Sequence, residues 1–139
     1  MTAGHRPIGV WIISIFYLLS IASTLVSLAS VITGVVEVTP AQRQYFDSLG
    51  PVDYLGNLLI LLISAWAVIE LFLLRNAAVR AFIIALVMNV GLTAFHLIAT
   101  NWREAAGSSG LATVIVSWIV SIAVVWYARH LQRNGVLRS

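Results

Sequence analysis

Residues 55–80 read LGNLLILLISAWAVIELFLLRNAAVR, and this stretch decides the fold. From Leu55 to Leu74 it is apolar apart from small polar side chains and one charged residue, Glu70. A helix of about 20 such residues is long enough to cross the hydrocarbon core of a bilayer, which is roughly 30 Å thick. Arg75 and Arg80 follow, so the stretch predicts a membrane span with a basic boundary.

Three more apolar runs, all free of lysine and arginine, have the same character. The chain is 60% hydrophobic and only 9% charged, with a mean hydropathy of +0.98, whereas soluble domains are roughly 25% charged. The sequence therefore predicts an all-α integral membrane protein with a single domain, a bundle of four transmembrane helices. We expect the helices over 8–34, 55–74, 81–100 and 111–128, and a tail over 129–139.

Arginines mark every second boundary between these runs. They are Arg6 before the first run, Arg75 and Arg80 after the second, and Arg129, Arg133 and Arg138 after the fourth. By the positive-inside rule, both termini and the 75–80 turn are cytoplasmic, with these arginines near lipid headgroups. The net charge of +3 is explained by these boundaries, so it does not indicate a nucleic-acid partner.

The longest connection carries the signals of a short helix over residues 40–49. Thr39 is a candidate N-cap, Pro40 suits the first helical position, and Gln42 can complete a capping box. Gly50-Pro51 ends the segment. We expect this helix to lie at the outer membrane interface as a cover for the bundle.

Small residues recur at helical spacing in the first and fourth runs. One row is Ser20, Ser23, Ser27, Ser30 and Gly34, and the other includes Ser117 and Ser121. Small side chains let helix backbones approach closely in lipid, where no hydrophobic force drives helices together. These rows are predicted packing faces, either inside the bundle or between protomers.

The third run carries a polar stripe of Asn89, Thr93, His96 and Thr100. Polar side chains in a span must face protein or water, and His96 is expected near the outer boundary at the depth of Asn57. The first interpretation is a neutral histidine that bonds to Asn or Ser neighbours. A ligand or proton site is the alternative.

Glu70 is the only charged residue inside any run. It lies roughly 9 Å from the bilayer centre on the cytoplasmic side, where an unpaired carboxylate is costly. Ser14 and Tyr17 are candidate donors, and Arg75 or Arg129 a candidate counter-charge. Paired with arginine, Glu70 is a structural clasp; unpaired in a crevice, it is a proton or cation site.

The chain lacks the residues that several classes of chemistry require. It has no cysteine, which excludes disulfides, thiolate metal sites and thiol redox chemistry. No nucleophile has a neighbouring base, no acidic pair is present, and a lone membrane histidine cannot supply bis-histidine haem ligation. We therefore predict no catalytic residue, no metal site and no dedicated cofactor.

The stretches Arg6 to Trp11, Leu71 to Val79 and Tyr127 to Leu131 resemble small, uncharacterised four-helix proteins of the bacterial inner membrane. That resemblance spans nearly the whole chain and implies an inner (plasma) membrane location, but no activity. A weaker similarity is to DoxX-like four-helix membrane proteins, through Phe46 to Pro51 and His96-Leu97. It implies quinone-linked redox chemistry, with His96 and Asn57 as candidates for a quinone headgroup.

Three functions remain at this stage. The first is a non-enzymatic membrane subunit or homo-oligomeric scaffold, whose partners are the bilayer and either copies of itself or another membrane protein. The second is a proton- or cation-coupled transporter or channel that uses Glu70. The third is a quinone-linked redox partner, which depends on the DoxX-like similarity alone.

Overall fold

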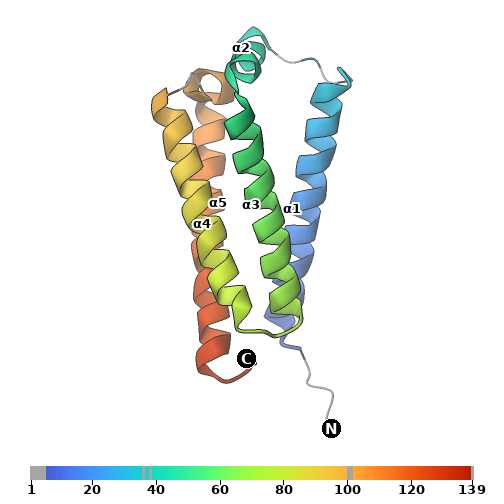
Figure 1. Cartoon of the computed structure of the whole chain (residues 1–139), viewed down its shortest axis with the longest axis vertical. Helices are drawn as coiled ribbons and strands as arrows, with labels where there is room; N and C mark the ends of the chain where they lie inside the picture. Colours follow the sequence, from blue (N-terminus) through green and yellow to red (C-terminus); the bar gives the residue numbers. More distant parts are fainter. Residues whose placement is uncertain (1–5, 36, 38, 100–101, 139) are drawn as a thin grey trace.

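The computed structural model describes residues 6–35, 37, 39–99 and 102–138. Within them the chain forms five helices: α1 (Ile8–Ile32), α2 (Pro40–Ser48), α3 (Pro51–Phe72), α4 (Ala77–Ala99) and α5 (Trp102–Arg133). The helices α1, α3, α4 and α5 stand side by side as a bundle, and α2 lies across one end (Figure 1). Four segments are long and apolar enough to span a membrane: Ile8–Ser30, Pro51–Phe72, Ala77–Ala99 and Ser109–Arg133. The chain is thus an all-α, multi-pass membrane protein, as predicted.

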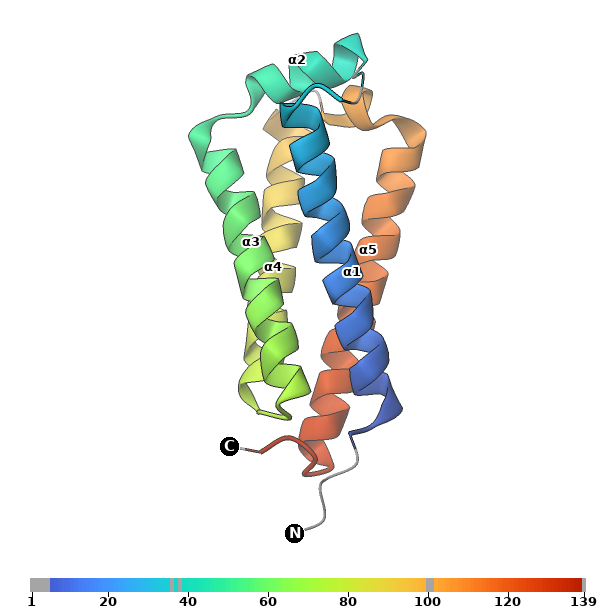
Figure 2. The same ribbon diagram turned by 90° about the vertical axis from the view of Figure 1, so that its right-hand side faces the viewer.

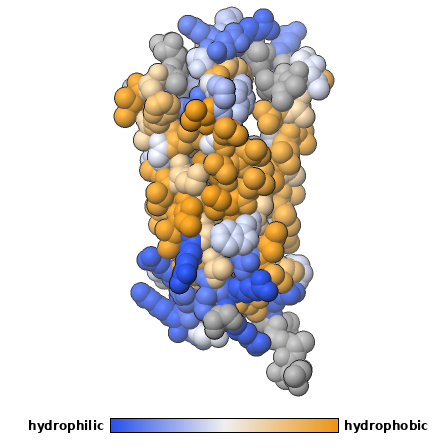
Figure 3. Space-filling model, in the orientation of Figure 1, coloured by the Kyte–Doolittle hydropathy of each residue, from blue (hydrophilic) through white to orange (hydrophobic). Residues whose placement is uncertain are grey.

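The bundle has two different ends. We call the end where α1 begins and α5 finishes the terminal end, and the end covered by α2 the α2 end (Figures 1 and 2). Hydrophilic residues gather at both ends and a broad hydrophobic band lies between them (Figure 3). That band contacts lipid, because large apolar side chains on all four spans are exposed in the single chain.

The buried core lies entirely in the half of the bundle next to the terminal end. Several of its members are alanines with no exposed surface, including Ala67, Ala78 and Ala128, so the helix backbones approach closely there. Gly9 serves the same purpose, because a side chain at this position would collide with the Tyr127 ring of α5. The core cluster comprises Val10, Ala67, Val68, Leu71, Ala78, Val79, Ala81, Phe82, Val124, Ala128, Leu131 and Leu137.

Glycines in the left-handed conformation follow the first and the last helix of the chain, α1 and α5. Gly34 (φ 69°) follows α1, and Gly135 (φ 68°) follows α5. In each case the next residue donates its backbone N–H to a carbonyl five residues earlier, Val35 to Ser30 and Val136 to Leu131. This is the Schellman arrangement, which glycine favours because it has no Cβ. Gly34 therefore ends α1, and no atom of the described residues lies within 4 Å of the place that a side chain would take.

The C-terminal tail folds back onto the turn between α3 and α4. Arg138 donates its backbone N–H to the Leu74 carbonyl (2.7 Å) and accepts from the Asn76 N–H (2.9 Å). Leu137 is buried in the core beside this bridge. The segment after α5 thus closes the terminal end of the bundle.

Several helix boundaries differ from the apolar runs, among them the starts of α3 and α5. The first turn of α3 begins at Pro51, four residues before Leu55, and includes Asp53. Within α5, Gly107 has φ 64° and ψ −168°, so residues 102–106 form a separate turn before the span. In both places the helix extends into polar sequence, which an apolar run does not mark.

The short helix α2 forms as its capping signals predict. The Thr39 hydroxyl accepts the Gln42 N–H (3.3 Å), and the Gln42 side chain accepts the Thr39 N–H (2.9 Å). This reciprocal pair is a capping box, with Pro40 at the first helical position. The helix lies over the ends of the spans and packs against α5.

Candidate functional site

The described residues hold three polar sites inside the bundle: one around Glu70, one around His96, and a cavity between them. Each is built by a different set of helices. Their geometry decides which of the predicted residues come together.

The Glu70 site is formed locally, at the terminal end of α3. The Glu70 carboxylate accepts a hydrogen bond from the Trp66 indole N–H (3.1 Å) and lies 3.5 Å from the Arg75 guanidinium. Its side chain is 11% exposed, whereas that of Arg75 is 59% exposed. Trp66 lies on α3, like Glu70, and Arg75 lies in the turn that follows α3. These side-chain contacts therefore do not join α3 to another span.

The candidate donors from α1 do not reach Glu70. The Ser14 hydroxyl is buried and, among the described residues, has no hydrogen-bond partner. Tyr17 lines the central cavity, and its ring packs edge-on against Phe82. Arg129 is exposed. Of the four predicted partners of Glu70, the structure therefore places only Arg75 beside it.

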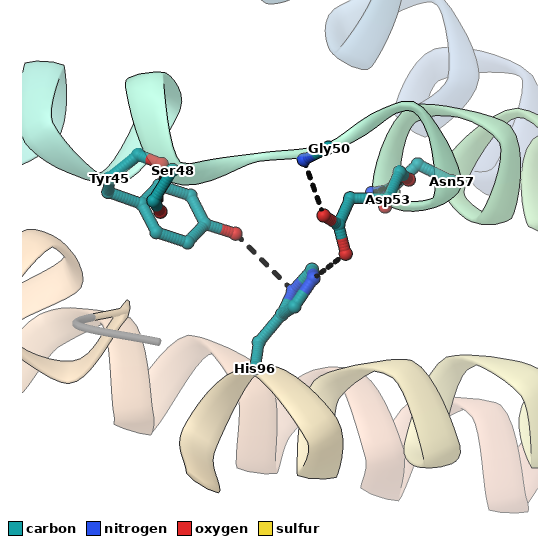
Figure 4. Close-up of polar contacts among 6 residues, drawn as sticks. All are labelled: Tyr45, Ser48, Gly50, Asp53, Asn57 and His96. Carbon is teal, nitrogen blue, oxygen red and sulfur yellow. Dashed lines mark hydrogen bonds and ion pairs between the residues drawn. The ribbon is translucent and has the colours of Figure 1, made fainter. Parts of the chain in front are cut away.

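The His96 site joins three helices at the α2 end (Figure 4). His96 Nε2 lies 2.9 Å from Asp53 Oδ1, and His96 Nδ1 lies 3.3 Å from the Tyr45 hydroxyl. His96 is 6% and Asp53 9% exposed. An imidazole protonated at Nε2 satisfies both contacts, since Nε2–H donates to the carboxylate and Nδ1 accepts from the phenol.

The carboxylate of Asp53 is held by its position in the first turn of α3. Its Oδ2 accepts the backbone N–H of Gly50 (2.8 Å), so Asp53 caps α3 with one oxygen and binds His96 with the other. Burial and the Asp53 charge raise the pKa of the Tyr45 phenol, which stays protonated and able to donate. The resulting chain Asp53–His96–Tyr45 ties α3, α4 and α2 together.

Asn57 does not reach His96, although it was predicted at the same depth. Its side-chain amide donates to the Asp53 backbone carbonyl at 2.9 Å instead. Thr93 likewise bonds within its own helix, to the Asn89 carbonyl at 2.7 Å. The predicted stripe therefore does not form one site: His96 belongs to this site, Asn89 lines the central cavity and Thr93 belongs to neither. Thr100 lies outside the described residues.

A cavity of about 330 Å³ occupies the centre of the bundle. All four spans line it, and more than half of the lining residues are polar; they include Ser20, Thr24, Asn57, Ser64, Asn89 and Ser117. Ser121 and Tyr17 complete its polar surface. Its described lining includes neither Glu70 nor His96, so it does not connect the two titratable sites.

The predicted packing rows have separate locations. Ser20, Ser117 and Ser121 line the cavity. Ser23 and Ser27 are exposed on the part of α1 beyond the core, and Ser30 bonds to its own helix at the Val26 carbonyl (2.8 Å). Most serines of the α1 row therefore do not face the interior of this bundle.

The boundary arginines all lie at the terminal end. Arg6 stacks over the Phe72 ring, with its guanidinium carbon 4.0 Å from the ring centre. Arg75 contacts Glu70, while Arg80, Arg129 and Arg133 are exposed. Because they share one end of the bundle, these arginines can all lie near the lipid headgroups of the same membrane face.

Asp53 and Tyr45 are the site residues that the sequence analysis missed. A signal for Asp53 was present: in Gly50-Pro51-Val52-Asp53, proline suits the first position of a helix and aspartate the third, where it can cap. That pattern places Asp53 in the first turn of α3, at the same depth in the membrane as the last turns of α4. No local pattern indicates that Tyr45 reaches His96, because they are 51 residues apart.

The chain matches no known family model, no curated protein and no solved structure. The comparisons therefore give no support to the similarity with DoxX-like proteins. The conclusions that follow rest on this chain's own residues.

Proposed function

We propose that this protein is a non-enzymatic subunit of the bacterial inner membrane that assembles with copies of itself through α1. The observation that carries the proposal is the unpacked half of α1. Val10 and Ser14 are buried near its start, but from Ala22 to Ala29 every residue is exposed. α1 packs on α3 and much less on α5, from which it diverges towards the α2 end (Figure 2).

The exposed part of α1 is suited to pair with its own copy. A two-fold interface requires a surface complementary to itself, and a row of small side chains on one helix meets that requirement. Ser23 and Ser27 lie on one side of the helix, and both are exposed. Because bilayer contacts do not need small side chains, the row favours a helix partner over lipid.

The alternatives have less geometric support. A transport path would need polar groups that join Glu70 to His96, and the central cavity reaches neither. Glu70 has a tryptophan and an arginine partner, which favours the clasp over a proton site. The redox alternative depended on a family resemblance that the comparisons do not support.

Single cysteines test the proposed interface directly, because the natural chain has none. We expect Ser27→Cys to form disulfide-linked dimers when membranes are treated with a mild oxidant. Ala29→Cys is the matched control: Ala29 is small and exposed, and two residues turn the helix by about 200°, to nearly the opposite side. Equal cross-linking of the two variants, or a purely monomeric native mass in nanodiscs, would refute assembly through this face.

We also propose that the terminal end is cytoplasmic, since the boundary arginines gather there. The test uses Ser48→Cys on α2 and Gln132→Cys near the end of α5, both at exposed positions. A membrane-impermeant maleimide added to intact spheroplasts should label Ser48→Cys at once and Gln132→Cys only after permeabilisation. The opposite pattern would invert the proposed topology.

A further inference from the structure

The central cavity lies near the middle of the bilayer. Each span contributes a polar residue within three positions of its own midpoint: Ser20, Ser64, Asn89 and Ser121. Polar groups at this depth have no water to bond and must find partners in protein or ligand. A cavity of this kind is a candidate binding site. Of the α1 serine row only Ser20 lines it, whereas Ser23 and Ser27, which are proposed for assembly, do not.

The cavity selects against charged ligands. None of its described lining residues carries a formal charge. A charged group taken to the centre of a bilayer requires a counter-charge or water, and the lining offers only hydroxyl and amide groups. The ligand is therefore uncharged.

Two asparagines give the cavity a donor and an acceptor of fixed orientation. The Asn57 amide nitrogen is engaged by the Asp53 backbone carbonyl (2.9 Å), which leaves its side-chain oxygen as an acceptor. The Asn89 side-chain oxygen accepts the Trp118 indole N–H (3.3 Å), which leaves its amide group as a donor. A hydroxyl group fits both, because it donates one hydrogen bond and accepts others.

The cavity is open to lipid between α1 and α5. Ser20 and Thr24 of α1 and Ser117 of α5 line it, yet all three residues are exposed. Its volume of about 330 Å³ is at the lower limit of ligand pockets, which measure about 300–1,000 Å³. It can hold a head of a few hydroxyl and ester groups, while attached chains extend into the bilayer.

From these four observations we propose that the cavity binds the uncharged, hydroxyl-bearing head of a membrane lipid such as diacylglycerol. The Asn57 side-chain oxygen accepts the head hydroxyl, and the Asn89 amide group donates to the oxygens of the head. The Ser121 hydroxyl already donates to the Ser117 carbonyl (2.8 Å), so further donors come from Ser20, Ser64 and Ser117. The acyl chains leave between α1 and α5. Phospholipids are excluded because their phosphate would meet no cation.

The test is photolabelling in nanodiscs with a diazirine-bearing diacylglycerol, and with phosphatidylcholine carrying the same diazirine as a comparison. Ser64→Leu fills the cavity, and Asn57→Leu removes its acceptor. Thr113→Leu is the matched control, because Thr113 is an exposed polar residue of α5 that does not line the cavity. Each variant is first checked for the wild-type native mass and melting temperature.

We expect saturable labelling by the diacylglycerol probe that excess unlabelled diacylglycerol suppresses. Either cavity variant should weaken the apparent affinity roughly fivefold or more, the effect of losing about one hydrogen bond, and Thr113→Leu should leave it unchanged. Equal labelling in all three variants would overturn the proposal, and so would equal labelling by phosphatidylcholine. Suppression by free glycerol but not by diacylglycerol would show a water-soluble ligand and would also overturn it.

Discussion

The two ends of this bundle are closed by different means. At the terminal end, alanines and Gly9 let four helices and the C-terminal tail pack tightly, with Leu71 and Val10 fully buried. At the α2 end, α1 stands apart (Figure 1), and the polar chain through His96 joins α2, α3 and α4. The difference indicates that small apolar residues let the helices pack closely at the terminal end, whereas much of α1 stays exposed towards the α2 end.

The largest predicted effect is at the terminal end. Leu71 is 0% exposed, so Leu71→Ala should lower the free energy of unfolding in detergent by about 2–5 kcal/mol, because it leaves a cavity. Leu58→Ala is the control from the other half of the same helix, where the side chain is 51% exposed, and should change stability by less than about 0.5 kcal/mol. Similar losses of unfolding free energy in the two variants would contradict the proposed difference between the ends.

A smaller loss is expected when the polar chain at the α2 end is broken. His96→Leu leaves the buried Asp53 carboxylate with only its Gly50 contact, so stability should fall, by less than in Leu71→Ala. The double variant Asp53→Leu with His96→Leu removes both partners and should recover part of the loss. Melting temperatures of the four proteins in the cycle measure this coupling, and simple additivity would show that the pair is not coupled.

Tyr45→Phe removes one hydrogen bond from the same chain and should cost about 0.5–1.5 kcal/mol. Because burial raises the pKa of Tyr45 in the folded protein, its contribution is fully present below its ordinary value of 10.0. Above that pH the unfolded chain loses the proton first, and the contribution falls until the folded phenol also ionises. The wild type should therefore lose stability above about pH 10 more steeply than Tyr45→Phe. Parallel pH profiles would contradict the assignment.

The smallest effect is expected at Glu70. The 3.5 Å contact with Arg75 involves a guanidinium side chain that is 59% exposed, so Glu70→Gln should cost less than about 1 kcal/mol. Glu70→Leu also removes the acceptor of the Trp66 indole and should cost more. A loss in Glu70→Gln as large as that of Leu71→Ala would indicate that the clasp holds the bundle together.

The sequence was sufficient for the spans and for α2. Apolar runs mark membrane helices because every backbone group must bond within its own segment, and the Thr39–Gln42 capping box acts over three residues. Boundaries were harder to predict: the first turn of α3 is polar, so the apolar run began after Asp53. For this reason the expected partner of His96 was Asn57, which lies one turn further along the helix than Asp53.

The cavity and the isolated half of α1 could not be predicted in the same way. Ser20 and Ser23 look alike in sequence, but Ser20 lines the cavity and Ser23 does not. The choice depends on how the other spans are placed around α1, which packs on α3 and approaches α5 closely at Gly9, beside Tyr127. Long-range packing of this kind leaves no local pattern in the chain.

The most direct test of the difference between the ends is a pair of spin-label distances between α1 and α5. Labels at Ile12→Cys and Trp126→Cys report the terminal end, and labels at Val26→Cys and Val116→Cys report the half nearer α2; all four positions are exposed. Double electron–electron resonance in nanodiscs, with labelled protein diluted in unlabelled protein, should give a short, narrow distribution for the first pair and a longer separation for the second. Equal distributions would mean that α1 packs against α5 along its whole length, and would contradict the open α2 end.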